Sequence, residues 1–316
     1  MRATMKIGLN LDNRGPGATP ENILRFAVMA DRLGFSSLAV SDHIVLVQQQ
    51  TNQYPYSTTG AIDFDAWTPW YDTLGLIGFV AGKTERIRLG PSVLILPYRN
   101  PLVTAKWFAT VDGLSSGRLF LGAGTGWWRE EFDALGLGDQ FAERGPRTDE
   151  YLRICKNLWQ EAIPAYQGQF FSYANLIASP KPVQAGGIPI WIGGNSRRAL
   201  RRVADVGDVW HPVVLTPPAD LNPVALGEQR ALLASFYEAR GRDPATMQIA
   251  PKTHLYFTQD RLRPLSGTPR HIVEDLLAYQ AQGVGEFIFY VPGASEPEKL
   301  DNLQRIAEEI LPQVSG

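Results

Sequence analysis

The sequence has little that would crosslink the chain or carry it into a membrane. Its single cysteine, Cys155, excludes an internal disulfide and a metal site built from several cysteines. No apolar run approaches the roughly 20 residues of a membrane-spanning helix. Residues 1–6 pass directly into the short apolar stretch 7–11, which leaves no room for the apolar core of a signal peptide. We therefore expect a cytoplasmic protein with no membrane contact and no metal site.

An excess of charge of one sign is also absent. The 30 Lys and Arg residues nearly balance the 32 Asp and Glu residues, for a net charge of -2. Such a balance gives no electrostatic attraction to nucleic acid. With 316 residues the chain can form one large α/β domain or two smaller ones, and it can bury a sizeable core either way. We predict one domain over 1–316.

The most informative segment is 86–128. Two apolar runs, 87–96 and 118–123, flank a helical pattern that begins at Pro101 and ends near Gly117. Parallel strands buried on both faces read as continuous apolar runs, so the segment predicts a strand–helix–strand unit. The second strand runs into Gly122-Ala123-Gly124-Thr125-Gly126, and closely spaced glycines at a strand end allow the backbone to approach a ligand.

The same alternation continues along the chain. Strands are predicted at 6–11, 37–40, 87–96, 118–123, 188–192, 209–211, within 248–258 and at 286–291, and helices at 20–33, 70–82, 101–117, 147–160, 196–206, 223–240, 269–282 and 296–311. Eight strand–helix pairs favour a closed (β/α)8 TIM barrel with insertion loops, whose active site lies at the carboxyl ends of the strands. The competing open, doubly wound sheet would carry a dinucleotide fingerprint in its first turn, and Asn13-Arg14-Gly15-Pro16-Gly17 has the wrong spacing for one.

Two strand ends carry residues suited to binding and catalysis. Gly193-Gly194-Asn195-Ser196 follows the strand at 188–192, and Asn195 or Ser196 can cap the next helix. A helix N-terminus of this kind binds phosphate, although an ordinary tight turn has the same composition. Asp42-His43 follows the strand at 37–40. This histidine is either an acid, base or ring ligand tuned by the neighbouring carboxylate, or an ordinary loop residue.

Several tryptophans fall near the same expected face of the barrel. Large aromatic side chains can line an apolar pocket for a planar ligand, and they are also ordinary core residues. The candidates are Trp67, Trp70, Trp127, Trp128 and Trp210.

Together these motifs resemble the bacterial luciferase-like superfamily, and within it the deazaflavin (F420)-dependent oxidoreductases. The resemblance covers nearly the whole chain. It implies a (β/α)8 barrel, usually a homodimer, with a flavin or deazaflavin bound at the carboxyl ends of the strands. The motifs that carry it are Ser41-Asp42-His43, Leu89-Gly90-Pro91-Ser92-Val93, Asn100-Pro101, the run 109–118, Gly124-Thr125-Gly126-Trp127 and Ile192-Gly193-Gly194.

The resemblance also implies which residues bind the cofactor. A non-proline cis peptide at Ser92–Val93 is expected to form a bulge that backs the cofactor ring. His43 and Asp42 match the pair at the ring edge, and His43 would be the proton donor or base. The remaining cofactor-binding positions are Thr125, Gly126, Gly193, Gly194 and Asn195. The cofactor phosphate is expected at the backbone of Gly193 and Gly194.

The preference for F420 over FMN depends on four arginines. F420 carries a lactyl oligoglutamate tail beyond its phosphate, so cations near the phosphate site favour it. At i,i+4 spacing the pairs Arg197/Arg201 and Arg198/Arg202 lie on neighbouring faces of one helix, with Arg197 first after the phosphate site. The alternative is a solvated helix face.

The predicted activity is hydride transfer between reduced F420 and an unidentified small organic substrate, with His43 exchanging the matching proton. One alternative is an FMN-dependent monooxygenase that takes reduced flavin from a separate reductase and activates O2. Another is a flavin- or deazaflavin-binding protein without turnover. Trp127 stands where sugar-phosphate dehydrogenases of the family carry a Glu, which argues against a sugar phosphate. The insert 48–64 is predicted to cover the substrate.

Overall fold

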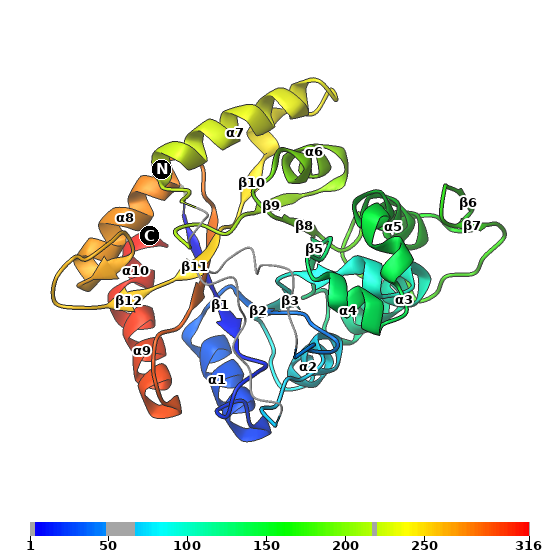
Figure 1. The fold of residues 1–316 in the computed structure, drawn as a ribbon. Helices are drawn as coiled ribbons and strands as arrows, with labels where there is room; N and C mark the ends of the chain where they lie inside the picture. Colours follow the sequence, from blue (N-terminus) through cyan, green and yellow to red (C-terminus); the bar gives the residue numbers. More distant parts are fainter. Residues whose placement is uncertain (1–3, 49–66, 217–219, 316) are drawn as a thin grey trace.

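The structure, a computed structural model, describes residues 4–48, 67–216 and 220–315. In Figure 1 the parallel strands lie at the centre and the helices form a ring around them. A small antiparallel hairpin, β6 (Tyr166–Gln167) with β7 (Ser172–Tyr173), projects from the ring beyond the helices. The insert predicted over 48–64 lies outside the described residues apart from Gln48.

Eight strand positions follow one another around the centre, and their pairings are parallel. They form two five-stranded sheets, ordered β11-β14-β1-β2-β3 and β10-β9-β8-β5-β4. The alternating (β/α)8 order confirms the predicted fold class. The strands are β1 (Lys6–Leu11), β2 (Ser37–Val40), β3 (Arg88–Pro91) continued by β4 (Leu94–Ile95), β5 (Leu121–Gly124), β8 (Ile190–Gly193), β9 (Val209–His211), β10 (Gln248–Ile249) continued by β11 (Lys252–His254), and β14 (Glu286–Tyr290).

The two sheets meet where a strand is interrupted, once between β3 and β4 and once between β10 and β11. A single parallel bridge joins the sheets at each place, Leu89 to Leu119 and Val213 to Lys252. The strand ring is therefore complete in order but is not one continuous ladder.

The prediction of one continuous strand over 87–96 is wrong, because the segment forms two short strands. Ser92 N still donates to Val40 O of β2 at 2.7 Å, whereas Leu94 already pairs with Ala123 of β5. The chain changes partners between these two points, so β3 and β4 are separate strands with Ser92 and Val93 between them.

The predicted helices are present, with shifted ends and two additions. Asp72 caps the second helix by accepting from Gly75 N, so this helix begins at Thr73 and not at Trp70. The helix expected from Arg147 begins one turn earlier, at Arg144. The helices are α1 (Pro20–Leu33), α2 (Thr73–Ala81), α3 (Pro101–Leu114), α4 (Arg129–Ala134), α5 (Arg144–Gln160), α6 (Arg197–Val206), α7 (Pro223–Glu238), α8 (Pro269–Ala281), α9 (Glu296–Glu309) and α10 (Leu311–Val314), of which α4 and α10 were not predicted.

The buried hydrophobic side chains of the described residues form three clusters. The largest lies between the strands and the surrounding helices. A second fills the inside of the strand ring and includes the stacked rings of Phe120 and Trp191, 4.2 Å apart, and a third joins Ile95, Tyr98 and Phe132. Side-chain layers of this kind fill the interior of TIM barrels. No helix in the described ranges is long and apolar enough to cross a membrane.

Candidate active site at the carboxyl ends of the strands

The peptide between Ser92 and Val93 is cis, as predicted, and lies in the bulge between β3 and β4. The neighbouring strands make room for it with glycine. A Cβ on Gly193 would lie 2.7 Å from Cγ1 of Val93, and one on Gly124 would overlap the other methyl group. The glycine-rich end of β5 thus makes room for the protein's own bulge; the approach of a ligand to its glycines remains a prediction.

The buried Ser92 connects this bulge to ionisable side chains of β9 and β11. Its hydroxyl lies 2.7 Å from Nε2 of His211, and Lys252 Nζ donates to Ser92 Oγ at 3.1 Å and to Ser92 O at 3.2 Å. Burial lowers the pKa of His211 to about 4; the Ala250 carbonyl opposes this shift and Lys252 adds to it. His211 is therefore neutral at pH 7 and supports the bulge by hydrogen bonding.

His43 is paired with a carboxylate that the sequence analysis missed. Its Nδ1 lies 2.6 Å from Oε2 of Glu131 in α4, and the Glu131 side chain is fully buried. The same carboxylate accepts from Ile44 N at 2.8 Å and from Tyr98 OH at 2.9 Å. With Nδ1 on Glu131, Nε2 is the ring nitrogen of His43 that can meet a ligand; among the described residues no hydrogen bond to it occurs.

Asp42 was predicted to be the carboxylate beside the His43 ring, but it does not pair with His43 in the structure. Its buried carboxylate accepts two hydrogen bonds of 2.8 Å from Arg99 and a third of 2.8 Å from Ile95 N. Bidentate pairing of this kind fixes geometry strongly. The carboxylate paired with His43 is Glu131, whereas Asp42 positions the segment 95–99; its contact with the cofactor remains a prediction.

Three indole rings surround His43 edge-on. The ring centres lie 5.2 Å away for Trp70, 5.6 Å for Trp128 and 6.3 Å for Trp127, and Trp127 stacks on Trp128 at 5.3 Å. These rings limit the directions in which the imidazole can turn.

Two of the five predicted pocket tryptophans, Trp210 and Trp67, are not among these three rings. Trp210 is fully buried and donates from Nε1 to Gly194 O at 3.0 Å, and Trp128, although beside His43, is also fully buried. Trp67 is 92% exposed. Of the five candidates, Trp70 and Trp127 are the ones that are both half-buried and beside His43.

The expected phosphate site is a helix N-terminus preceded by two glycines. Ser196 caps α6 by accepting from Ala199 N at 3.2 Å. Asn195, the alternative cap, instead bonds Val213 twice, at 2.7 Å through Nδ2 and at 3.1 Å through Oδ1. Gly194 has φ +109, a conformation that favours glycine. The backbone N–H groups at the start of α6 can therefore receive an anion, while the side chain of Asn195 is occupied within the protein.

Arg144, which was not predicted as a site residue, lies near the N-terminus of α6. Arg144, at the start of α5, donates from Nε to Gly126 O at 3.1 Å, in the loop that also carries the half-buried Thr125. Burial lowers the pKa of Arg144, and the charge of Arg198 lowers it further. Neither arginine has a carboxylate partner within the described part of the chain. An anion bound near both guanidinium groups would relieve their repulsion.

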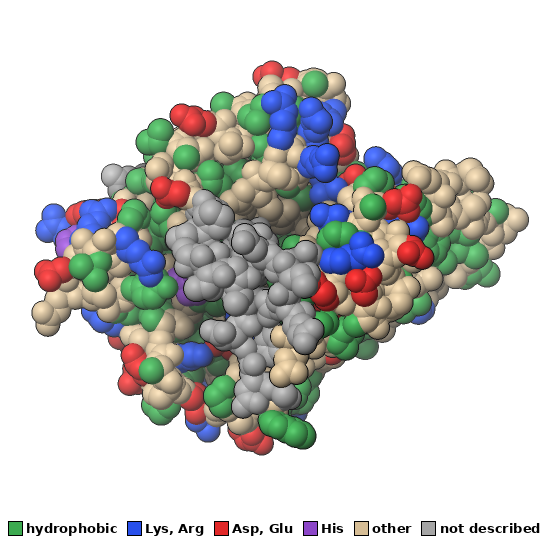
Figure 2. Space-filling model, viewed as in Figure 1, with side chains coloured by type: hydrophobic (Ala, Val, Ile, Leu, Met, Phe, Trp, Pro, Cys, Tyr) green, Lys and Arg blue, Asp and Glu red, His purple; other side chains and the backbone are tan. Residues whose placement is uncertain are grey.

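The four arginines of α6 do not form one patch. Arg197 and Arg201 lie over the ring of Phe236 in α7, at 5.4 and 5.6 Å, and Arg202 forms an ion pair with Asp149. Arg198 is left as the member that approaches Arg144. Figure 2 shows arginine and lysine side chains gathered over α5 and α6 on the face seen in Figure 1.

A cavity of about 250 Å³ opens on the opposite side of the same strand ends, at β1, β2, β11 and β14. Lys252, which contacts Ser92 of the bulge, lies in its wall, whereas His43 does not. The lining is mostly polar and includes Asn10, Asn13, Ser41, Lys252, His254 and Tyr290.

Comparison with known proteins identifies the family. The sequence profile of the luciferase-like monooxygenases matches residues 5–264. The chain belongs to this family.

Relatives of this luciferase-like protein include F420-dependent enzymes. An uncharacterized protein of Mycobacterium tuberculosis is 33% identical over 178 residues, which span 56% of this chain and 60% of that protein. The F420-dependent glucose-6-phosphate dehydrogenase of Kineococcus radiotolerans is 31% identical over 253 residues, 79% of this chain and 68% of the relative. A solved F420-dependent secondary alcohol dehydrogenase, in complex with an F420-acetone adduct, superimposes with a TM-score of 0.77 at 16% identity, over 99% of this chain and 100% of that one. This last likeness establishes the fold of the luciferase-like protein.

Sequence reasoning missed four residues in this luciferase-like site. Glu131 lies in α4, a helix of six residues that is too short to show a periodic pattern. Arg144 precedes Gly145 and Pro146, which read as a turn. Tyr290 lies near the end of the strand predicted at 286–291 and ends β14, whereas Lys252 lies inside the segment 248–258 and begins β11. The signal that could have identified Tyr290 is its place at the carboxyl end of a barrel strand, because polar residues there face the active site.

Proposed function

We propose that the protein is an F420-dependent oxidoreductase that acts on a small organic molecule. The observation that carries this proposal is the approach of Arg144 and Arg198 at the N-terminus of α6, two cations without a carboxylate partner among the described residues. A cofactor with a phosphate and an acidic tail supplies the missing negative charge. F420-dependent relatives support the same choice.

The residues fit such a cofactor. The Ser92–Val93 bulge would back the ring, and the backbone of Gly193, Gly194 and the first turn of α6 would hold the phosphate. Arg198 and Arg144 would bind the acidic tail, in place of the predicted Arg197. A bound deazaflavin supplies a two-electron hydride donor or acceptor.

The protein's part in catalysis is to orient the reactants and to move protons. Glu131 holds Nδ1 of His43, so Nε2 would be the nitrogen that meets the edge of a bound ring. His43 is thus the acid or base proposed at the ring edge, and Glu131 is its positioning residue.

The main alternative is an FMN-dependent monooxygenase that uses O2, which the family description favours. In that case a separate reductase would supply reduced flavin. A binding protein without turnover would keep the phosphate site and need no ordered His43–Glu131 pair. A homodimer remains a prediction for all three.

Thermal unfolding with added cofactor tests the proposal. A ligand that binds the folded state alone raises Tm in proportion to the logarithm of its concentration over Kd. We expect F420 to raise Tm more than FMN at equal concentration. A larger shift with FMN would favour the monooxygenase, and no shift with either would refute cofactor binding.

A further inference from the structure

Lys252 is a buried cation without an acidic partner. It is 5% exposed, and its Nζ donates to the carbonyl and hydroxyl of Ser92. No carboxylate of the described ranges forms an ion pair with it. Burying a charge is costly unless a counter-charge compensates, so the site is arranged to receive a negative oxygen.

Tyr290 is the phenol beside Lys252 in the cavity wall. It ends β14, and Lys252 Nζ lies 4.6 Å from the centre of its ring. Burial raises the pKa of Tyr290, but Lys252, Ser41 and Arg14 outweigh it, so the pKa lies below its ordinary value. The phenol proton is therefore easier to remove than that of a free tyrosine.

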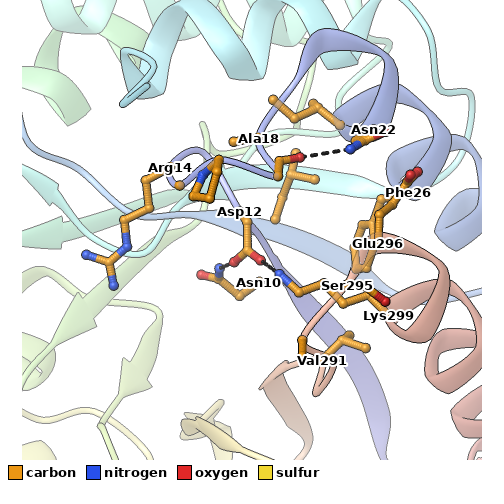
Figure 3. Close-up of a pocket in the computed structure, with 16 residues that line it drawn as sticks. Asn10, Asp12, Arg14, Ala18, Asn22, Phe26, Val291, Ser295, Glu296 and Lys299 are labelled. Atoms are coloured by element: carbon orange, nitrogen blue, oxygen red, sulfur yellow. Dashed lines mark hydrogen bonds and ion pairs between the residues drawn. The ribbon is translucent and has the colours of Figure 1, made fainter. Parts of the chain in front are cut away.

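The neighbouring carboxylate does not compete with Tyr290 for Lys252. The one carboxylate in the cavity wall, Asp12, is held by Lys299 at 2.5 Å and by Asn10 at 3.1 Å. Figure 3 shows Asp12 between these two partners, with Arg14 pointing away from them. Asp12 is thus committed on the α9 side.

The histidines near the pair are neutral at pH 7. His254 stacks on Tyr290 at 4.4 Å, and burial, followed by the charge of Lys252, lowers the pKa of His254 to about 4. His211, which reaches Ser92 from the other side, also titrates near pH 4. Lys252 and Arg14 therefore carry the positive charge that faces Tyr290 on this side of the ring.

The cavity wall offers further polar contacts for a ligand. Asn10 is 5% exposed, and its Oδ1 has no hydrogen-bond partner within the described part of the chain. A buried acceptor without a partner costs free energy unless a ligand supplies a donor. A substrate hydroxyl fits this acceptor.

We propose that Tyr290, supported by Lys252, is the catalytic residue that exchanges a proton with the substrate oxygen, and that the cavity takes a small alcohol or its carbonyl product. This inference rests on the proposed function. In the oxidation direction the carbinol C–H bond breaks and its electron pair leaves as hydride to the bound deazaflavin. The O–H proton passes to the Tyr290 phenolate, and the C=O bond forms. His43, which does not line the cavity, then serves the ring edge.

The first test needs no cofactor. The tyrosinate absorbance of the cofactor-free protein is titrated with pH, and the curve of Tyr290→Phe is subtracted. We expect one tyrosine that ionises below the ordinary value of about 10. Lys252→Met should raise its pKa, and Lys252→Arg should largely preserve it. A difference curve at or above the ordinary value, or one unmoved by Lys252→Met, would overturn the proposal.

The second test measures turnover of F420 with a panel of secondary alcohols. Tyr290→Phe should lower kcat by about 10²–10⁴-fold and remove the rise of kcat/KM with pH, while F420 affinity stays unchanged. Tyr256→Phe is the matched control, because Tyr256 lies 6.0 Å from His254 but outside the cavity wall. Unchanged kcat in Tyr290→Phe, or F420 binding without oxidation of any alcohol, would refute the inference alone. Failure of F420 to bind would instead refute the proposed function.

Discussion

Glu131 and His43 form a carboxylate–imidazole pair in which Oε2 lies 2.6 Å from Nδ1. The pair joins α4 to the loop that follows β2, and its two residues are 88 positions apart in the chain. Because Tyr98 OH and Ile44 N also donate to Glu131, the carboxylate has little freedom to move. Such a fixed pair lets one ring nitrogen exchange protons while the other is held.

The first prediction concerns this pair. His43→Asn keeps a polar side chain but removes the titrating group, so turnover should fall by about 10²–10⁴-fold with little change in F420 affinity. Glu131→Gln should cost less. Because the two residues act as a unit, the double variant should lose no more than His43→Asn alone. Additive losses in kcat, measured over this double-mutant cycle, would show that they act independently.

The second prediction concerns the tail site. Arg198→Ala should weaken F420 more than FMN, and it should reduce the dependence of F420 affinity on salt because fewer charges are screened. Arg201→Ala is the matched control, since Arg201 lies on the same helix but over Phe236. Equal losses from the two substitutions, in fluorescence titrations at low and high salt, would contradict the assignment.

The third prediction concerns Gly124, which packs against Val93 of the bulge. Gly124→Ala should destabilise the protein by about 1–3 kcal/mol, because its Cβ would overlap Val93. Gly113→Ala in α3, where a Cβ meets nothing within 4 Å, should be neutral or stabilising. Val93→Ala should restore part of the loss in Gly124→Ala. Denaturant unfolding measures all of these, and a Gly124→Ala protein as stable as the parent would show that the strands can shift apart.

The sequence predicted the fold class well but predicted the pairing of individual site residues poorly. Repeated strand–helix alternation was enough for the fold class, and the resemblance located Ser92–Val93. It did not predict which carboxylate would meet His43, because Asp42 is adjacent in sequence and Glu131 is brought there by the fold. The roles of Arg197 and Arg198 also depend on the face of α6 from which each side chain projects. Arg197 lies against α7, and Arg198 lies toward α5. Adjacent residues on a helix point about 100° apart, and sequence alone does not say which direction is the site.

The fourth prediction concerns stability and pH. The pKa of His211 is about 4 in the folded protein, against about 6.5 in the unfolded chain. Above pH 6.5 both states are neutral and the contribution to stability is complete; as the pH falls below 6.5 the unfolded state binds the proton first. Between pH 7 and 5 this residue alone should lower the free energy of unfolding by about 2 kcal/mol.

Replacement of the histidine isolates that contribution. His211→Gln should be less stable at pH 7, because its contact with Ser92 changes, but it should lose less stability on going to pH 5. Denaturant unfolding at the two pH values gives the comparison. An identical pH dependence in parent and variant would mean that His211 is protonated in the folded state.

The most direct test of the central claim is the equilibrium Kd of the parent protein for F420 and for FMN, measured by fluorescence titration in the same buffer. We predict tighter binding of F420. We also predict that the margin between the two cofactors narrows when Arg144 and Arg198 are both replaced by Ala. Tighter binding of FMN, or a margin that the double replacement leaves unchanged, would contradict the account.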